Sequence, residues 1–560
     1  MRRVFVGAVV GAVVLVVAAV AVAQIINGVP NANPRSGSPA NIVANGFALQ
    51  RVVNGNDTLE NPVGVFARYG YLDDSTIQPD HQPTKTEPDQ NTYLVTKHSP
   101  GGPTAGYDYG HHFLIQGHEV FSAAGQPNRA YFTRINLDVK DPAHRITLLN
   151  PLVKDATDSG MRSIDGSTYD PFNRQLLFTA EAGNLGGVFG QPLRWSATTA
   201  PAVVNYDGSM GKAGYEGVDN DKLGNVMLVE DTGGGGVVDP NSTTTPPALL
   251  PVKQPNSFVL RFKPKSPGDL TKGKLQALQV SVDGTPIVFH NGATDGAAAQ
   301  RDDALGAGIL ALHSGQTLQA KWVTIHDTDV DGTTAFDANA LAKTKLATPL
   351  KRPENGKFVP GTDFRSFVVD ETGDTSKVAG DYPGAAERGA WGALLRIDTP
   401  KAGADTATVK AVIVGDQTHA SFDNVTFLDK GTVLLTEDRG ETLHQQANAL
   451  DSLWSYDITK PLDKVNADAK RLIAQGRDPE ATGDIALKEP APPTALTHND
   501  GDNELTGVHV SDGSTSPSGI LGAHLPTNAG GWSPWRMFIT GQHGANITYE
   551  IVATGKKGHW

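Results

Sequence analysis

The chain has 560 residues, of which 62 are glycine, 36 are proline and none is cysteine. This many glycines and prolines, spread along the chain, favour short elements joined by turns and exclude a helical bundle or a coiled coil. The missing cysteine excludes disulfides, thiolate metal sites and iron–sulfur clusters. The 47 basic and 60 acidic residues give a net charge of −13, which leaves no basic excess for a nucleic acid and suits divalent cations better.

The N-terminus has the features of an export signal. Arg2 and Arg3 precede about twenty apolar residues, and Ala21-Val22-Ala23 supplies the small side chains at which a signal peptidase cleaves. We expect cleavage after Ala23, so that residues 1–23 are a signal peptide. The alternative is an uncleaved anchor, because the apolar run is close to the length that spans a bilayer. In both cases the mature chain lies outside the cytoplasm, as a secreted, periplasmic or cell-envelope protein of a bacterium.

After an extension over residues 24–105 that is rich in glycine, asparagine and proline, the sequence predicts an all-β domain over residues 106–560. Short apolar runs, such as those at 130–137, 175–179 and 225–229, are each joined to another run by a turn that carries Asp, Asn or Gly. A pair of strands cannot bury its faces alone and needs stacked neighbours. We therefore expect a β-propeller with loop insertions, with a β-sandwich or a β-helix as the alternatives.

Acidic residues recur at the ends of the predicted strands over more than 350 residues, which favours the propeller. In a propeller, equivalent strand ends from different blades meet at one axial mouth, where two carboxylates 4 Å apart would repel by ~4 kcal/mol at an effective dielectric of about 20. Such a set persists only around cations, and oxygen ligands without a thiolate favour calcium. The alternative is that these acids cap turns and face water. The predicted metal ligands at strand ends are Glu181, Glu216, Glu354, Glu437 and Glu504.

A second candidate calcium site is the segment from Asp327 to Gly332. Asp327, Asp329 and Asp331 have the D-x-D-x-D-G spacing that wraps oxygen ligands around calcium. Position twelve of an EF-hand loop needs a glutamate, but Ala338 stands there, so the segment is not a full EF-hand. We expect a structural calcium loop between two blades, with a plain acidic turn as the alternative.

Histidines gather between Tyr109 and Glu119. His112 and His118 are separated by an even number of residues, so on a strand they share one face. They either bind a transition metal or a phosphate group, or they are hydrogen-bonded fixtures of a blade.

An ordered set of short motifs resembles the PhoX-type alkaline phosphatase family over about residues 106–552. The set consists of the acidic strand end at Glu181, Glu216-Gly217-Val218-Asp219, Arg352-Pro353-Glu354, Asp423-Asn424 before a strand, Glu504-Leu505-Thr506-Gly507 and a strand that ends at Gln542-His543-Gly544. Members of that family are secreted six-bladed propellers that use calcium and iron to hydrolyse phosphate monoesters.

The resemblance implies a role for each matching residue. Glu181, Glu216 and Glu354 would hold the metal cluster, Arg352 would orient the phosphate group, and His543 would lie beside the mouth, so that Arg352, Glu354 and His543 are the predicted catalytic residues. The chain departs from the family pattern at Ala180, where the family has its iron-ligating cysteine, and at Ala182, where it has a glutamate. Calcium is therefore the expected cofactor, and the match for iron is poor.

Taken together, the sequence predicts an exported, metal-dependent phosphatase that acts on phosphate monoesters at an axial site. One alternative is a non-catalytic propeller stabilised by calcium that binds a ligand. Another is a phytase-like phosphohydrolase that uses calcium alone. We expect a monomer whose partner is a small phosphorylated substrate, with no nucleic acid, and with a membrane only through an uncleaved signal.

Overall fold

The structure is a computed structural model, and it describes residues 27–34, 40–72, 86–120, 129–151, 163–182, 185–195, 202–476, 504–520, 535–542 and 546–554. The predicted signal peptide lies outside the described residues. Within them, none of the helices has both the length and the apolar character needed to cross a membrane.

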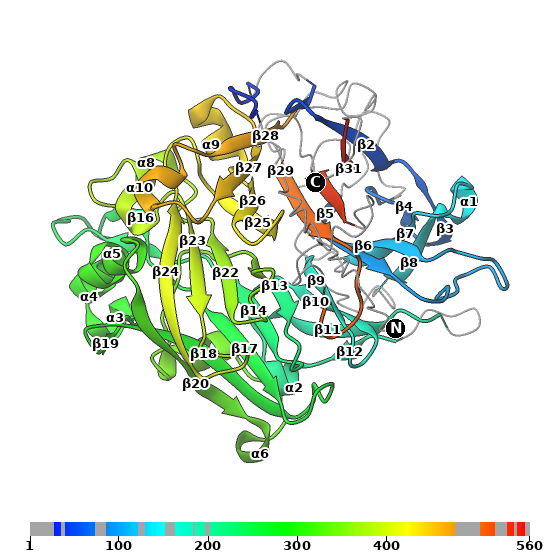
Figure 1. Cartoon of the computed structure of the whole chain (residues 1–560). Helices are drawn as coiled ribbons and strands as arrows, with labels where there is room; N and C mark the ends of the chain where they lie inside the picture. The colour runs from blue at the N-terminus through cyan, green and yellow to red at the C-terminus, as the bar shows by residue number, and fades with distance from the viewer. Residues whose placement is uncertain are drawn as a thin grey trace, which may run out of the picture.

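The described strands form a β-propeller, which confirms the predicted fold class (Figure 1). Six inner strands contact one another in a closed ring around the axis. In chain order they are β5 (Glu87–Val95), β9 (Ile164–Asp170), β13 (Tyr215–Asn220), β21 (Gly356–Phe358), β25 (Phe422–Phe427) and β29 (Glu504–Ser511).

Each inner strand begins an antiparallel sheet of four strands, which is one blade. The second strands are β6 (His112–Glu119), β10 (Gln175–Ala180), β14 (Val226–Glu230), β22 (Ser366–Glu371), β26 (Thr432–Glu437) and β30 (Arg536–Gln542). The third strands are β7 (Tyr131–Asn136), β11 (Gly187–Pro192), β17 (Val259–Pro264), β23 (Ala393–Asp398), β27 (Ser452–Asp457) and β31 (Ile547–Ala553). The outer strands are β8 (Ile146–Pro151), β12 (Val204–Asn205), β18 (Gly273–Val282), β24 (Thr406–Val414), β28 (Lys470–Ala474) and β2 (Phe47–Val53).

The ring is closed by a strand from the N-terminal part of the chain. In Figure 1 the blue strand β2 lies beside the red strand β31, and the register pairs Phe47 with Ala553 and Leu49 with Ile551. Strand β1 (Ile42–Val43) extends the fifth blade at β28, and β5 is the inner strand of the first blade. The boundary that we expected at residue 105 is therefore wrong, because part of the predicted extension supplies strands to three blades.

The third and fourth blades are fused by β20 (Leu318–Asp327), which pairs with β18 on one side and with β24 on the other. The two blades, β20 and β19 (Thr285–Pro286) together make one ten-stranded sheet. The remaining strands are β3 (Thr58–Val63), β4 (Phe66–Arg68), β15 (Gly236–Val238) and β16 (Leu249–Lys253).

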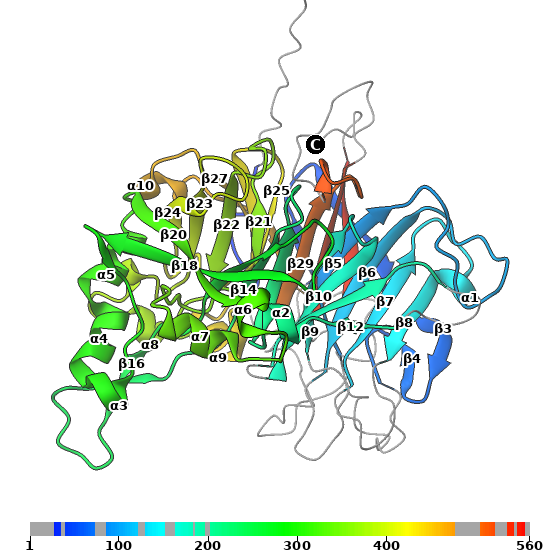
Figure 2. The ribbon, with the colours of Figure 1, turned by 90° about the horizontal axis from the view of Figure 1, so that it is seen from below.

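Short helices occupy the loops between strands. They are α1 (Pro142–Arg145), α2 (Asp207–Met210), α3 (Gly292–Asp295), α4 (Ala297–Leu305), α5 (Ala307–His313), α6 (Thr328–Asp331), α7 (Ala338–Thr344), α8 (Lys377–Gly380), η2 (Ala386–Arg388), α9 (Gly440–Ala447) and α10 (Leu462–Val465). Figure 2 shows α3, α4, α8 and α9 together on the lower side of the sheets, opposite the side that carries the label C.

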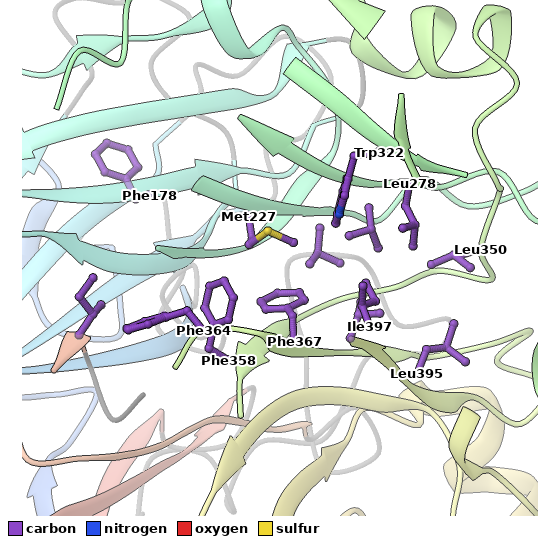
Figure 3. Packing of buried hydrophobic residues seen from close by; sticks show 14 of the residues in the cluster. Phe178, Met227, Leu278, Trp322, Leu350, Phe358, Phe364, Phe367, Leu395 and Ile397 are labelled. Atoms are coloured by element: carbon purple, nitrogen blue, oxygen red, sulfur yellow. The ribbon is translucent and has the colours of Figure 1, made fainter. Parts of the chain in front are cut away.

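The core lies between the blades, because each sheet is covered by a neighbour on both faces. All six residues of β10 are buried, and Leu176–Phe178 form a continuous apolar run within the strand instead of alternating with polar residues. Phe178 on β10 packs edge-on against Phe132, with the ring centroids 4.4 Å apart. Figure 3 shows the same packing between the third and fourth blades, where Phe358, Phe364 and Phe367 lie near Met227.

Candidate metal centre

The blade topology brings acidic residues from different blades to one end of the propeller. In every blade the second strand runs antiparallel to the inner strand, so the end of the second strand lies beside the start of the inner one. Glu87 pairs with Glu119 in the first blade, and Glu504 pairs with Gln542 in the sixth. An acid at either position therefore lies at the same mouth.

Bulges in the inner strands place several of these acids. The register between β13 and β14 shifts between Tyr215 and Val218, so Glu216 lies in the irregular stretch. Similar register shifts occur in β5 at Asp89 and in β25 at Asp423. A bulge leaves a residue outside the regular ladder and changes the direction of its side chain, which is how these carboxylates leave the alternation of the sheet.

Three groups of carboxylates form a connected cluster, which we call the axial cluster. Within each group, one oxygen per residue lies within 4.8 Å of the others. Asp165 belongs to two groups and Glu216 to two, so the groups run continuously from the first blade to the fourth. The groups are Asp89, Glu119 and Asp165; Asp165, Glu181 and Glu216; and Glu216, Asp231 and Glu354.

Several oxygens of the axial cluster have no hydrogen-bond partner among the described residues. They are Oε1 of Glu119, Oδ1 of Asp165 and Oε2 of Glu216, on side chains that are more than nine-tenths buried. An unpaired buried carboxylate is costly unless a cation or a proton neutralises it. The arrangement is therefore complete only with a positive charge between the carboxylates.

The pKa values of the cluster reflect this crowding in the metal-free chain. Burial, followed by repulsion from neighbouring carboxylates, raises the pKa of Glu119, Asp165 and Glu216 well above the ordinary range. Burial raises the pKa of Glu354 to about 7, and burial raises the pKa of Asp89 to about 6 although Thr506 donates a hydrogen bond to it. Protons therefore bind where cations would bind, and the two compete.

One cation of the chain itself faces the cluster. The guanidinium of Arg352 donates from Nε and Nη2 to Asp231, with Nη2 2.6 Å from Oδ2, and Nη2 lies 3.2 Å from Oε1 of Glu354. Burial alone would lower the pKa of Arg352, but Asp231 and Glu354 outweigh it and raise that pKa well above its usual value. The Arg352 side chain is 23 % exposed, and no hydrogen bond to its Nη1 is formed within the part of the chain that the structure describes.

Hydroxyl and amide side chains also hold the carboxylates in place. Thr372 donates its Oγ1 hydrogen to Glu354 in a very short hydrogen bond and also contacts the carbonyl of Phe422, 2.8 Å away. Thr506 and Gln542 donate to the two oxygens of Asp89, at 2.7 and 3.0 Å. These contacts connect neighbouring blades, so the positions of the acids depend on the closed ring.

The structure brings Glu181, Glu216 and Glu354 together, as the sequence predicts. Glu504 lies nearby: it is half-buried, and burial followed by Asp438 and Asp423 raises its pKa well above the ordinary range. It is not a member of the three groups.

Glu437 is not brought into the cluster. Its Oε1 accepts from Nη2 of Arg439, 2.9 Å away, and from the backbone of Ala420. The prediction that Glu437 is a metal ligand is therefore not supported, because Glu437 belongs to none of the three groups and one of its oxygens is paired with an arginine.

The calcium loop predicted at Asp327, Asp329 and Asp331 is not supported either. The segment forms the short helix α6, with Asp327 as its N-cap. Lys274 lies 3.0 Å from Asp327, and Lys265 lies 2.7 Å from Asp329. Asp327 and Asp329 are thus paired with lysines, and Asp331 accepts the backbone N–H of Asp327, as in an ordinary acidic turn.

His543 lies outside the described residues. His118 is fully buried, contacts Thr86 and Thr133 through its two ring nitrogens, and stacks on Tyr131. Burial lowers its pKa well below the usual value. His118 is therefore a hydrogen-bonded fixture of the first blade.

Sequence reasoning did not name four members of the cluster as metal ligands, namely Asp89, Glu119, Asp165 and Asp231. A repeated two-residue motif in the sequence identifies one of them, Asp165. Asp165-Gly166, Glu216-Gly217, Glu354-Asn355 and Asp423-Asn424 each place an acid before glycine or asparagine, at or just before the start of an inner strand. Gly166 shows why the small residue is needed, because a Cβ there would lie 1.9 Å from the carbonyl oxygen of Glu216.

No family model and no curated protein matches the chain. Among solved structures, it is similar to PhoX of Pseudomonas fluorescens in complex with vanadate, a transition state analogue, with 9 % identity, a TM-score of 0.50, and coverage of 94 % of this chain and 98 % of that chain. The GH93 α-L-arabinofuranosidase of Fusarium graminearum with arabinobiose gives 10 % identity, 90 % and 98 % coverage, and a TM-score of 0.35. At 9 % identity, the likeness to PhoX shows the fold alone.

Proposed function

We propose that this protein is an exported, calcium-dependent phosphatase that hydrolyses phosphate monoesters at the axial cluster. The observation that carries the proposal is the combination of buried, unneutralised carboxylates with one partly exposed arginine at the same mouth. The distant fold likeness to PhoX supports the same choice. The export part rests on the sequence of the first 24 residues.

The donor atoms fit calcium. Two oxygens bound to one calcium ion at 2.3–2.6 Å lie no more than about 5 Å apart, and the oxygens within each carboxylate group satisfy that limit at 4.8 Å. Because the groups share Asp165 and Glu216, the cluster has room for more than one cation. Glu119, Asp165, Glu181, Glu216 and Glu354 would hold them.

Iron fits less well. The chain has no cysteine, the three groups contain carboxylates alone, and Ala180 stands where the family has its thiolate ligand. Hard oxygen ligands favour calcium over metals that prefer sulfur or imidazole.

Bound calcium would supply positive charge that stabilises the negative oxygens of a phosphate group in the transition state. The chain's own contribution is orientation. Asp231 holds the Nε–Nη2 edge of Arg352 and leaves Nη1 directed away from that pair. A phosphate oxygen would take a charge-assisted hydrogen bond from Nη1. Thr372 keeps Glu354 in place while the charge on phosphate changes.

A second candidate function is a non-catalytic propeller in which calcium stabilises the fold and the mouth binds a ligand. Ala180 favours it, because the family's thiolate is missing. The pairing of Arg352 with Asp231 also favours it, because one edge of the guanidinium fork is already occupied.

Hydrolysis of p-nitrophenyl phosphate by the purified protein, with calcium and after chelation, separates the two functions. The phosphatase predicts turnover that needs calcium and falls at least about 100-fold in Glu354→Gln, since a charged ligand is lost. The matched control is Glu230→Gln. Glu230 is fully buried and neighbours Asp231, but Asn339, Thr232 and Phe258 satisfy its oxygens. Absence of turnover with calcium or with added iron would reject the phosphatase and leave the binding function.

A further inference from the structure

A second set of buried charged side chains is built around Lys351, the residue that precedes Arg352. Glu371 at the end of β22 accepts the backbone N–H of Lys351 at 2.8 Å and contacts Nε2 of His313 at 2.7 Å. Asp374 lies 2.8 Å from the ammonium of Lys351. We call these four residues, Lys351, Glu371, Asp374 and His313, the Lys351 clamp. All four are buried.

The other members of the clamp bind Lys351 at its backbone and at the end of its side chain. Glu371 takes the main-chain N–H of Lys351, and Asp374 takes the end of its side chain. The backbone adds two bonds, because Gly373 donates to the carbonyl of Lys351 and Thr372 donates to that of Arg352, at 3.1 and 2.8 Å. The peptide units on both sides of Arg352 are thereby fixed.

That fixation matters because Arg352 has a φ of +50°. The left-handed region is unfavourable for a residue with a Cβ and persists only where the surroundings impose it. Glu371 and Asp374 hold Lys351 itself, so without them the bond from Gly373 alone would hold the peptide before Arg352, and the backbone of Arg352 would relax to a more common region. The direction of its side chain would change, and the guanidinium would leave Asp231.

His313 completes the clamp from helix α5, which lies between β19 and β20 in the chain. It is the last residue of α5, and its Nδ1 faces the carbonyl of Ile309 at 2.8 Å. Nδ1 therefore donates to that carbonyl, and Nε2 shares a proton with Oε2 of Glu371. Gly389 packs closely on the same ring, because a Cβ there would lie 2.5 Å from Nε2. The imidazole is thus held in one orientation and in turn holds the carboxylate of Glu371.

We propose that Glu371, oriented by His313, is a positioning residue that holds Arg352 in its left-handed conformation and so aims the guanidinium at the mouth. The consequence for phosphate binding rests on the proposed function. Glu371 itself does not touch the substrate. It acts through Lys351 and Arg352.

The test compares Glu371→Ala with Glu371→Gln, each in the wild-type chain and in an Arg352→Ala background. Glutamine keeps an oxygen for the N–H of Lys351 and an amide for His313, so it restores the clamp, whereas alanine removes both contacts. With calcium present, we expect Glu371→Ala to weaken inorganic phosphate binding about 10-fold and to lower kcat/KM for p-nitrophenyl phosphate about 30-fold. Glu371→Gln should remain within about threefold of wild type.

The Arg352→Ala background separates positioning from general damage. In that background, Glu371→Ala should lower phosphate affinity and kcat/KM by less than about threefold, because the group that Glu371 positions is already absent. The matched structural control is Asp451→Ala. Asp451 is also a buried acid that contacts a histidine, His444, at 3.0 Å and accepts a backbone N–H, that of Arg439. The Asp451→Ala variant should lower Tm, as Glu371→Ala does, and should leave phosphate binding unchanged. Equal losses in both Arg352 backgrounds would overturn the proposal.

A crystal structure of Glu371→Ala gives a readout that does not depend on the proposed function. We expect Arg352 to leave the left-handed region and to lose its contact with Asp231. An unmoved Arg352 would refute the positioning role even if the protein is a phosphatase. A displaced Arg352 in a protein without phosphatase activity would support the positioning role and reject the proposed function alone. If Glu371→Ala does not fold, His313→Leu takes its place, because it removes the support of Glu371 and leaves the bond to Lys351.

Discussion

Removal of calcium should make the stability of this protein fall as the pH rises. Glu354 and Asp89 have raised pKa values in the folded, metal-free chain, about 7 and about 6, because they are buried. In the unfolded chain both ionise near their ordinary values of about 4. Between these limits the folded state binds more protons than the unfolded state, so the free energy of unfolding decreases with increasing pH.

The size of the effect follows from the shifts. A displacement of about 2 pKa units corresponds to roughly 3 kcal/mol for one carboxyl group at 1.36 kcal/mol per unit. The decrease in the free energy of unfolding begins above pH ~4 and is complete above pH ~7. For a cooperative unit of this size, at about 2.1 cal/mol/K per residue, 3 kcal/mol lowers Tm by roughly 3 °C. The remaining acids of the axial cluster shift in the same direction and add to the loss.

Calcium should reverse this dependence, because it binds the ionised carboxylates and therefore stabilises the fold more strongly at pH 8 than at pH 5. The assay is thermal unfolding at pH 5, 6, 7 and 8, after chelation and with added calcium. The control is Glu354→Gln, which should flatten part of the metal-free curve. A metal-free Tm that stays constant or rises from pH 5 to 8 would refute the predicted pH dependence. An equal rise in Tm on adding calcium at pH 5 and at pH 8 would refute it as well.

Three further changes test the fold and its connection to the site. Phe178→Ala removes a ring from between two blades and should lower the free energy of unfolding by about 3–5 kcal/mol in denaturant titrations; a loss below 1 kcal/mol would contradict the core packing. Gly166→Ala should weaken calcium binding at least ~10-fold by calorimetry, because its Cβ would push the Glu216 backbone away; unchanged affinity would contradict the close approach. Deletion of residues 27–54 removes β2 and should abolish the single cooperative melting transition, and an unchanged transition would contradict ring closure.

The sequence predicts the architecture well where the signal is local. Short apolar runs separated by Asp, Asn and Gly turns indicate strands, and continuous runs such as Leu176–Phe178 are typical of strands that are covered on both faces. Ring closure is different. The pairing of Leu49 with Ile551 joins residues about 500 positions apart, and a local pattern carries no information about it.

The site was predicted where an acid stands at a recognisable strand end, as for Glu181 and Glu216. Asp89 was missed because a bulge decides the direction of its side chain. Asp89 follows a proline in β5 and reaches the cluster because the register shifts there. Glu437 shows the opposite case, since its position on β26 fits the pattern but its side chain pairs with Arg439 and joins none of the three carboxylate groups. Neither outcome depends on composition or spacing, because both depend on which side chains meet in the folded chain.

The central claim is that the axial carboxylates coexist around bound cations. The most direct measurement is anomalous X-ray diffraction from crystals of the full chain grown with calcium at pH 8. We predict anomalous peaks within 2.3–2.6 Å of oxygens from Glu119, Asp165, Glu216 and Glu354. A map without such peaks, in which the same carboxyl groups are bonded to one another or to water alone, would contradict the account.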